Sequence, residues 1–156
     1  MIHERAPEFK IGKGIVVREG TDVCLLATGN MLPGAVRAAD KLAESGVSAQ
    51  VVSFHTVKPL DEQLLSEVFS RFAAVASVEE HSVLGGLGGG IAEWLSDHPG
   101  QRARFRRIGT ADTFLHDAGE QEFAREYFGL TPEGITEKTR RLYRAAVSGP
   151  HAPVRT

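Results

Sequence analysis

Short apolar runs alternate with segments of helical periodicity along most of this sequence. Residues 15–18, 23–27, 50–54, 74–78 and 105–108 form runs rich in apolar and β-branched side chains, which is typical of strands. Helical patterns occupy residues 33–45, 61–72, 87–95, 121–128 and 131–146. In chains where strands and helices alternate, the strands form a mostly parallel sheet and the helices cover both of its faces. The pattern therefore predicts a layered α/β domain.

The length and the two ends suggest how the chain is divided. It has 156 residues, which suits one domain with one core. Residues 1–14 contain Pro7 and show no sustained period, so we expect a linker or lead-in segment there. Residues 15–146 are expected to form the domain. Residues 147–156, with Pro150 and Pro153, are expected to be a flexible tail.

Capping signals support two of the helices. Asp61 follows Pro59 and precedes an apolar helical pattern, so it is expected to cap the helix that begins there. Thr131 is followed by Pro132, a cap residue and a first-turn proline in the favoured order. These signals predict where two helices begin.

Composition excludes several classes of protein. The formal net charge is -2, from 18 basic and 20 acidic side chains, which provides no footprint for nucleic acid or an anionic membrane. No stretch approaches the roughly 20 apolar residues of a membrane span. The single cysteine, Cys24, rules out an intrachain disulfide and fits a reducing compartment, so we expect the cytoplasm.

The most distinctive segment joins the run at residues 74–78 to the helix that follows. Such strand ends are where open α/β sheets bind ligands, and bare amides at a helix N-terminus can hold an anion. Glycine also serves tight turns and close helix packing, which we favour here. The candidate interface or anion loop comprises Glu79, Glu80, His81, Gly85, Gly86, Gly88, Gly89 and Gly90.

No self-sufficient catalytic set emerges from the residues. The glycines do not match the dinucleotide-binding pattern G-x-G-x-x-G. When the pattern starts at Gly86 and Gly88, its last position is Ile91. Glu79 and His81 can share one side of a strand, and structural or interface hydrogen bonding is favoured over acid/base catalysis. The histidines lack metal-site spacing, and Cys24 fits a small buried hydrophobe. We therefore assign no catalytic, cofactor-binding or metal-binding residue to this chain.

Two motifs together resemble the C-terminal domain of the transketolase family. The first is residues 55–61, HTVKPLD, preceded at residues 27–30 by ATGN. The second is residues 78–81, VEEH, followed by GGLG at residues 85–88. The resemblance extends from about Arg18 to Tyr143. The same domain ends 1-deoxyxylulose-5-phosphate synthase and the beta chains of 2-oxo acid dehydrogenases, and the motifs are most similar to transketolase.

This resemblance implies a three-layer, Rossmann-like fold with a five-stranded mixed sheet that has one antiparallel strand, expected at Ile15 to Arg18. In the family, thiamine diphosphate and its magnesium lie between two other domains. One of those domains carries a G-D-G…N-N motif, which this sequence lacks. We therefore expect the cofactor and metal to be bound by partner domains or subunits, and not by this chain.

The resemblance leaves several functions open. The first is a C-terminal domain or split subunit of a transketolase-type transferase of pentose phosphate chemistry, moving a two-carbon ketol unit between sugar phosphates. Its role would be assembly and dimer contact within a homo-oligomer, and it would be inactive alone. The second is the docking domain of a 2-oxo acid dehydrogenase beta chain. The third is a regulatory module that binds a small anionic ligand at the glycine-rich loop.

Overall fold

The computed structural model describes residues 7–117 and 119–148. Most of the expected tail, residues 149–156, and the start of the expected linker, residues 1–6, lie outside the described residues. Helix α5 ends at Val147, one residue beyond its expected end. Among the described residues, no helix is both long enough and apolar enough to cross a membrane.

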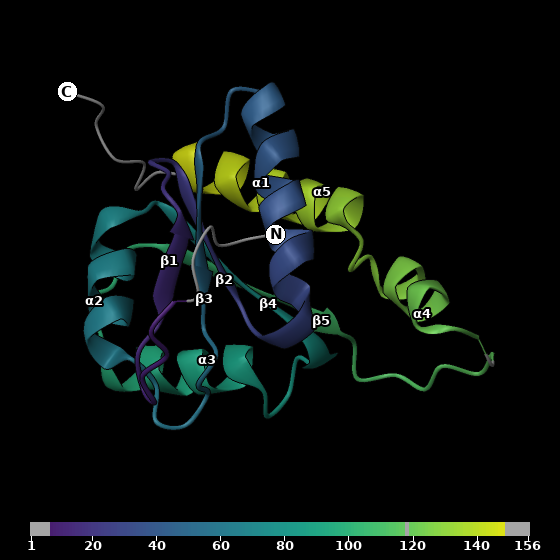
Figure 1. Cartoon of the computed structure of the whole chain (residues 1–156). Coiled ribbons are helices and arrows are strands. Elements are labelled where there is room, and N and C mark those ends of the chain that lie inside the picture. The colour runs from purple at the N-terminus through teal and green to yellow at the C-terminus, as the bar shows by residue number, and fades with distance from the viewer. Residues whose placement is uncertain (1–6, 118, 149–156) are drawn as a thin grey trace.

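A five-stranded mixed sheet forms the centre of the domain (Figure 1). Its strands are β1 (Ile15–Arg18), β2 (Val23–Ala27), β3 (Ala49–Ser53), β4 (Ala74–Ser82) and β5 (Arg104–Thr110), in the order β1-β3-β2-β4-β5. Strand β1 pairs antiparallel with β3, and the other neighbours are parallel. The predicted fold class and the antiparallel first strand are both confirmed.

Helices cover the sheet on both faces, which makes three layers (Figure 1). Helices α1 (Leu32–Glu44) and α5 (Pro132–Val147) pack on one face. Helices α2 (Glu62–Arg71) and α3 (Leu87–Asp97) pack on the other. The short helix α4 (Gln121–Phe128) stands away from this body, and a 3-10 turn, η1 (Gly29–Met31), precedes α1.

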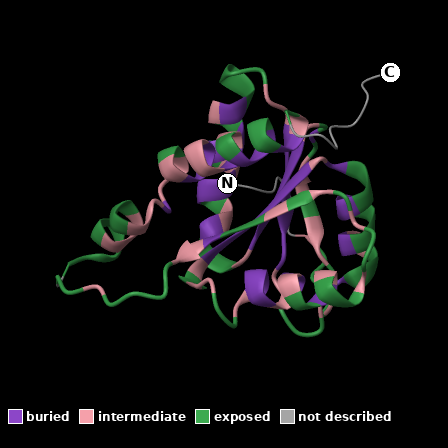
Figure 2. Ribbon diagram, turned by 180° about the vertical axis from the view of Figure 1, so that it is seen from behind, coloured by how far each residue is buried: buried purple, intermediate pink, exposed green. Residues whose placement is uncertain are grey.

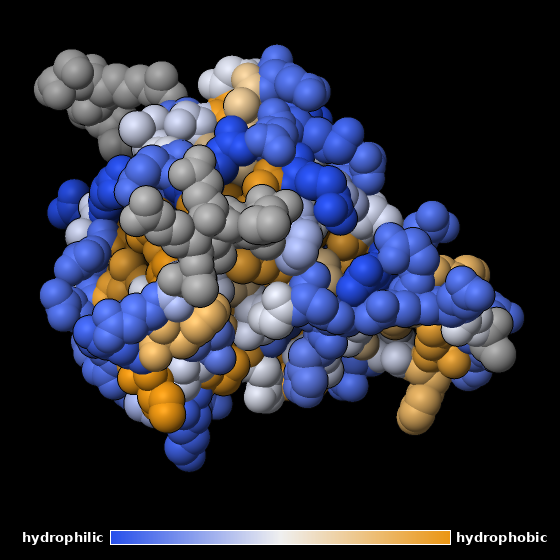
Figure 3. Space-filling view, viewed as in Figure 1, coloured by the Kyte–Doolittle hydropathy of each residue, from blue (hydrophilic) through white to orange (hydrophobic). Residues whose placement is uncertain are grey.

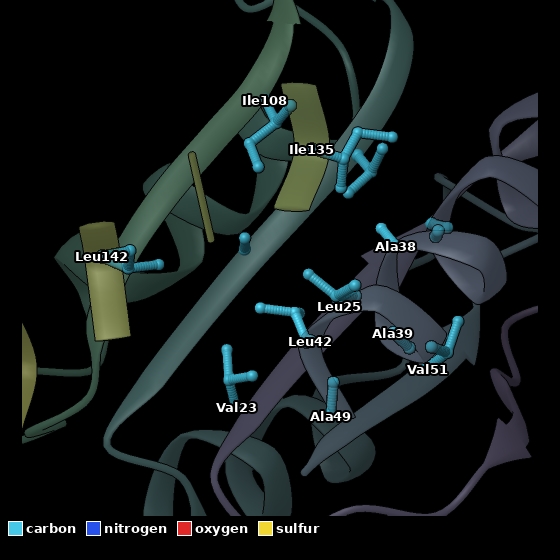
Figure 4. Close-up of a cluster of buried hydrophobic side chains, with 14 of the residues drawn as sticks. Val23, Leu25, Ala38, Ala39, Leu42, Ala49, Val51, Ile108, Ile135 and Leu142 are labelled. Carbon is cyan, nitrogen blue, oxygen red and sulfur yellow. The ribbon is translucent and has the colours of Figure 1, made fainter. Parts of the chain in front are cut away.

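The sheet divides the apolar interior into two clusters, where the sequence suggested one core. On one face, Leu25, Val51 and Ile108 of the sheet lie in a cluster with Leu42 of α1 and Ile135 of α5 (Figure 4). Leu26 and Val52 alternate to the opposite face and meet α2 and α3. This two-sided burial explains why β2 and β3 are buried along their whole length (Figure 2).

The strand at residues 74–78 is longer than the sequence predicted. It continues through Ser82, and a register shift after Val78 precedes the pairing of Ser82 with Thr110. The expected loop at residues 79–82 is therefore strand, because β5 extends alongside it and supplies backbone partners. Gly88, Gly89 and Gly90, which the candidate loop included, lie in the first turn of α3, within the helical pattern expected at residues 87–95.

Replacement of Leu26 by alanine should destabilise the domain by about 2–5 kcal/mol, because its fully buried side chain would leave a cavity in the α2/α3 cluster. The matched control is Leu84→Ala, since Leu84 is 51% exposed. Its effect should stay within about 0.5 kcal/mol. Urea unfolding followed by circular dichroism measures both, and equal effects would contradict the two-cluster core.

Candidate functional site

Glu79 is a buried acidic residue near the carboxyl end of the sheet, with only 1% exposure. Its carboxylate accepts hydrogen bonds from the backbone N–H of Leu87 (2.7 Å) and of Gly88 (2.9 Å). These amides belong to the first turn of α3, where unpaired donors and the helix dipole favour a negative charge. The chain therefore places its own carboxyl group at the N-terminus of α3.

Two glycines make room for this carboxylate. A Cβ atom at Gly86 would lie 2.0 Å from Glu79 Oε2. A Cβ atom at Gly88 would lie 2.5 Å from Ser77 Oγ and 2.8 Å from Glu79 Oε1. The close approach of α3 to β4 thus requires glycine at both positions, which agrees with the packing role favoured from sequence.

Glu80 points away from Glu79 and joins three segments of the chain. Its carboxylate accepts hydrogen bonds from Asn30 in η1, from Gln121 Nε2 (2.9 Å) and from Arg125 Nε (2.7 Å), the last two in α4. Arg125 Nη2 lies 3.3 Å from the second carboxylate oxygen, so the pair is bidentate. We call this arrangement the Glu80 clasp.

The clasp changes the ionisation of Glu80. Hydrogen bonding from Arg125 is the main cause that lowers the pKa of Glu80 from its ordinary value, and the bonds from Asn30 and Gln121 act in the same direction. Burial opposes this shift. The same ion pair raises the pKa of Arg125. Glu80 is therefore held as an anion at neutral pH, bonded to groups of its own chain.

Asp61 forms a third polar junction at the same end of the sheet. Its side chain caps α2 by accepting from Leu64 N–H (3.2 Å), as the sequence predicted. It also accepts from Gly14 N–H (3.0 Å) and Lys13 Nζ (3.2 Å). The segment before β1 is thereby attached to the loop that follows β3.

The remaining residues of the candidate loop are spread over different surroundings. His81 is exposed, with its Nδ1 2.9 Å from the carbonyl oxygen of Ser82. It lies on the same side as Glu79, since a Cβ atom at Gly86 would approach both side chains. Gly85 has a φ of 79°, which suits glycine in the turn. An interface role for His81 stays a prediction.

Neither a thiol nor a metal cluster adds chemistry in the part of the chain that the structure describes. Cys24 is buried, and burial raises the pKa of its thiol, so it behaves as a small hydrophobe as expected. No group of three or more His, Cys, Asp and Glu side chains with the arrangement of a metal site occurs among the described residues. Glu79, Glu80 and Asp61 each bond to groups of the same chain.

Sequence reasoning found the loop but missed the partners of Glu80. Asn30 lies 50 residues before Glu80 in the chain, and Arg125 lies 45 residues after it. No local spacing rule links such positions. The only available signal was that Asn30 and Glu80 both belong to the motifs that carry the family resemblance.

Comparison with known proteins gives consistent matches. The family model described as "Transketolase, C-terminal domain" matches residues 12–135. A putative transketolase C-terminal section of Methanocaldococcus jannaschii is 37% identical over 136 residues, covering 87% of this chain and 42% of the relative. A 6-deoxy-6-sulfo-D-fructose transketolase subunit of Clostridium sp. is 41% identical over 135 residues, covering 86% and 41%.

One solved structure resembles the fold closely. It is titled "Split gene transketolase, inactive beta4 tetramer", with a TM-score of 0.83 and 33% identity. The match covers 92% of this chain and 46% of that chain. The present chain thus spans less than half the length of these similar proteins.

Replacement of Gly88 by alanine should lower the free energy of unfolding by about 1–3 kcal/mol, because the added Cβ overpacks the contact with Ser77 and Glu79. Gly89→Ala is the matched control in the same helical turn. Its Cβ would meet nothing closer than 4.0 Å, and alanine favours helix by up to about 1 kcal/mol. Chemical denaturation should therefore show a lower free energy of unfolding than the wild type for Gly88→Ala and a higher one for Gly89→Ala.

The clasp also predicts a pH dependence of stability. Because the folded-state pKa of Glu80 is lowered, its contribution is present above the ordinary value of 4.5 and is lost as the pH falls below it. Glu80→Gln should therefore flatten the decline in unfolding free energy in that acidic window, measured by urea titration at several pH values. Glu122→Gln, which removes a more exposed contact with Arg125 but keeps Glu80, is the matched control and should retain the decline. Parallel curves for the wild type and Glu80→Gln would contradict the clasp.

Proposed function

Because this chain belongs to the transketolase C-terminal domain family, we propose that it is the assembly domain or split subunit of a transketolase-type thiamine diphosphate enzyme. The parent reaction would move a two-carbon ketol unit between sugar phosphates. In this proposal the chain works in the cytoplasm within a homo-oligomer, and it contributes contacts between parts of the enzyme without catalytic residues of its own.

One observation carries this proposal: three carboxylates at the carboxyl end of the sheet, those of Asp61, Glu79 and Glu80, are bonded within the chain. Glu79 accepts hydrogen bonds from α3, and Glu80 accepts them from η1 and α4. Asp61 accepts them from α2 and from the segment before β1. A magnesium ion that holds a diphosphate needs oxygen ligands facing an open site. These three residues do not fit that need, which supports a cofactor site on partner domains.

The lengths of the similar proteins support the same conclusion. A chain that covers 42% of one relative and 46% of a split transketolase chain corresponds to one part of each. The remaining polypeptide of such proteins can carry the cofactor site. We therefore assign binding of thiamine diphosphate and magnesium to other domains or subunits of the same enzyme.

The isolated chain should bind no thiamine diphosphate, even with excess magnesium, because the carboxylates of Glu79 and Glu80 are already bonded to backbone amides and to Arg125. Isothermal titration calorimetry should show only heats of dilution. A transketolase with all of its domains, titrated in the same buffer, is the positive control. A saturable site of micromolar affinity on the isolated chain would refute the division of roles proposed here.

A further inference from the structure

Large exposed apolar side chains gather at one end of the molecule. Val57 follows β3, Leu84 follows β4, and Phe114 follows β5. Four more lie on segments that are attached to this end: two on the segment before β1, which bonds to Asp61, and two on α4, which the Glu80 clasp ties to β4. The seven residues, which we call the carboxyl-end face, are Phe9, Ile11, Val57, Leu84, Phe114, Phe123 and Tyr127.

This distribution is uneven over the described part of the chain. Within residues 7–117 and 119–148, only Val16, within β1, is a large apolar side chain that is exposed outside the carboxyl-end face. Figure 3 shows apolar atoms at the lower margin of the molecule, on the side where the parallel strands end in Figure 1. Exposed apolar residues that gather in this way mark an interaction surface more often than single ones do.

Helix α4 is the clearest part of this face. It has eight residues, and none of them is buried. Its Phe123 is 39% exposed and its Tyr127 is 58% exposed, and their rings lie 6.5 Å apart. Helices this short are unstable without tertiary contacts, and the Glu80 clasp provides one through Arg125. The clasp therefore holds the two aromatic rings in place while they remain uncovered.

The segment before β1 indicates where a preceding polypeptide would lie. Phe9 packs edge-on against His55, which follows β3, with ring centroids 4.9 Å apart. Lys13 and Gly14 bond to Asp61 at the same end of the sheet. The family match is to a C-terminal domain, so in such proteins the rest of the enzyme precedes this region. That polypeptide would approach from the carboxyl-end face.

We propose that the carboxyl-end face docks onto an apolar surface of the cofactor-binding polypeptide that precedes this domain in the transketolase-type enzyme, with Phe123 and Tyr127 as its main aromatic contacts. This inference rests on the proposed function and identifies the face and the partner surface. Aromatic side chains that are held rigidly in advance bury a large area at low entropic cost, which suits them to anchor such a contact.

A chimera tests the proposal. In this chimera the full chain replaces the matching region of the Methanocaldococcus jannaschii relative. The rest of the relative then supplies the docking partner within the same polypeptide. Amide hydrogen exchange is then compared between this chimera and the free chain. Residues 121–128 should exchange at least about tenfold more slowly in the chimera, because docking covers α4.

Paired variants separate docking from folding. In the chimera, replacing both Phe123 and Tyr127 by serine should abolish the extra protection of residues 121–128. Val16→Ser is the matched control, since Val16 is 39% exposed, as Phe123 is, but lies outside the face. It should leave that protection unchanged. Circular dichroism and urea unfolding of each free variant verify that the domain remains folded.

The outcomes distinguish this inference from the proposed function. Protection that appears over α1 and α5, and not at residues 121–128, would overturn the docking face while leaving the proposed function intact. A chimera that gains no protection at all would count against the proposed function itself. Protection of residues 121–128 in the free chain that rises with concentration would show that a second copy covers the face, which would overturn the proposal.

Discussion

The buried carboxylate of Glu79 sets the connection between β4 and α3. With 1% exposure it needs partners, and it finds them in two backbone amides of the first turn of α3. This contact brings the helix so close to the strand that Gly86 and Gly88 have no space for a Cβ atom. Helix α3 then carries Leu87, Ile91 and Trp94 into the cluster beneath the sheet. One buried carboxylate thus positions α3 against the sheet.

Polar and apolar groups at the carboxyl end of the sheet are used differently. The carboxylates of Asp61, Glu79 and Glu80 all accept hydrogen bonds from the chain itself, which fixes the segment before β1, α3 and α4. The large apolar side chains beside them remain exposed. An end where these three carboxylates are bonded internally while the large apolar side chains stay uncovered suits contact with protein better than chemistry. This contrast supports the assembly role that we propose.

The structure weighs differently on the two other functions considered from sequence, a regulatory module and a docking domain of a 2-oxo acid dehydrogenase beta chain. A small anionic ligand at the glycine-rich loop would compete with Glu79 for the amides of Leu87 and Gly88. That competition weighs against the regulatory module. A docking domain of a 2-oxo acid dehydrogenase beta chain would share the fold. However, the relatives described above are named as parts of transketolases, and others of similar identity are 1-deoxy-D-xylulose-5-phosphate synthases, which favours these enzymes over a dehydrogenase beta chain.

By itself the sequence determined the α/β architecture, the helix caps at Asp61 and Thr131, and the family, because periodicity, capping and motifs are local patterns. It also located the segment of residues 79–90. Only the tertiary structure decided what that segment does. The extension of β4 to Ser82 depends on pairing with β5, and the Glu80 clasp joins residues 45 and 50 positions away. The exposure of Phe123 and Tyr127 likewise depends on where α4 packs, because contacts between residues far apart in the chain arise only when the folded backbone brings them together.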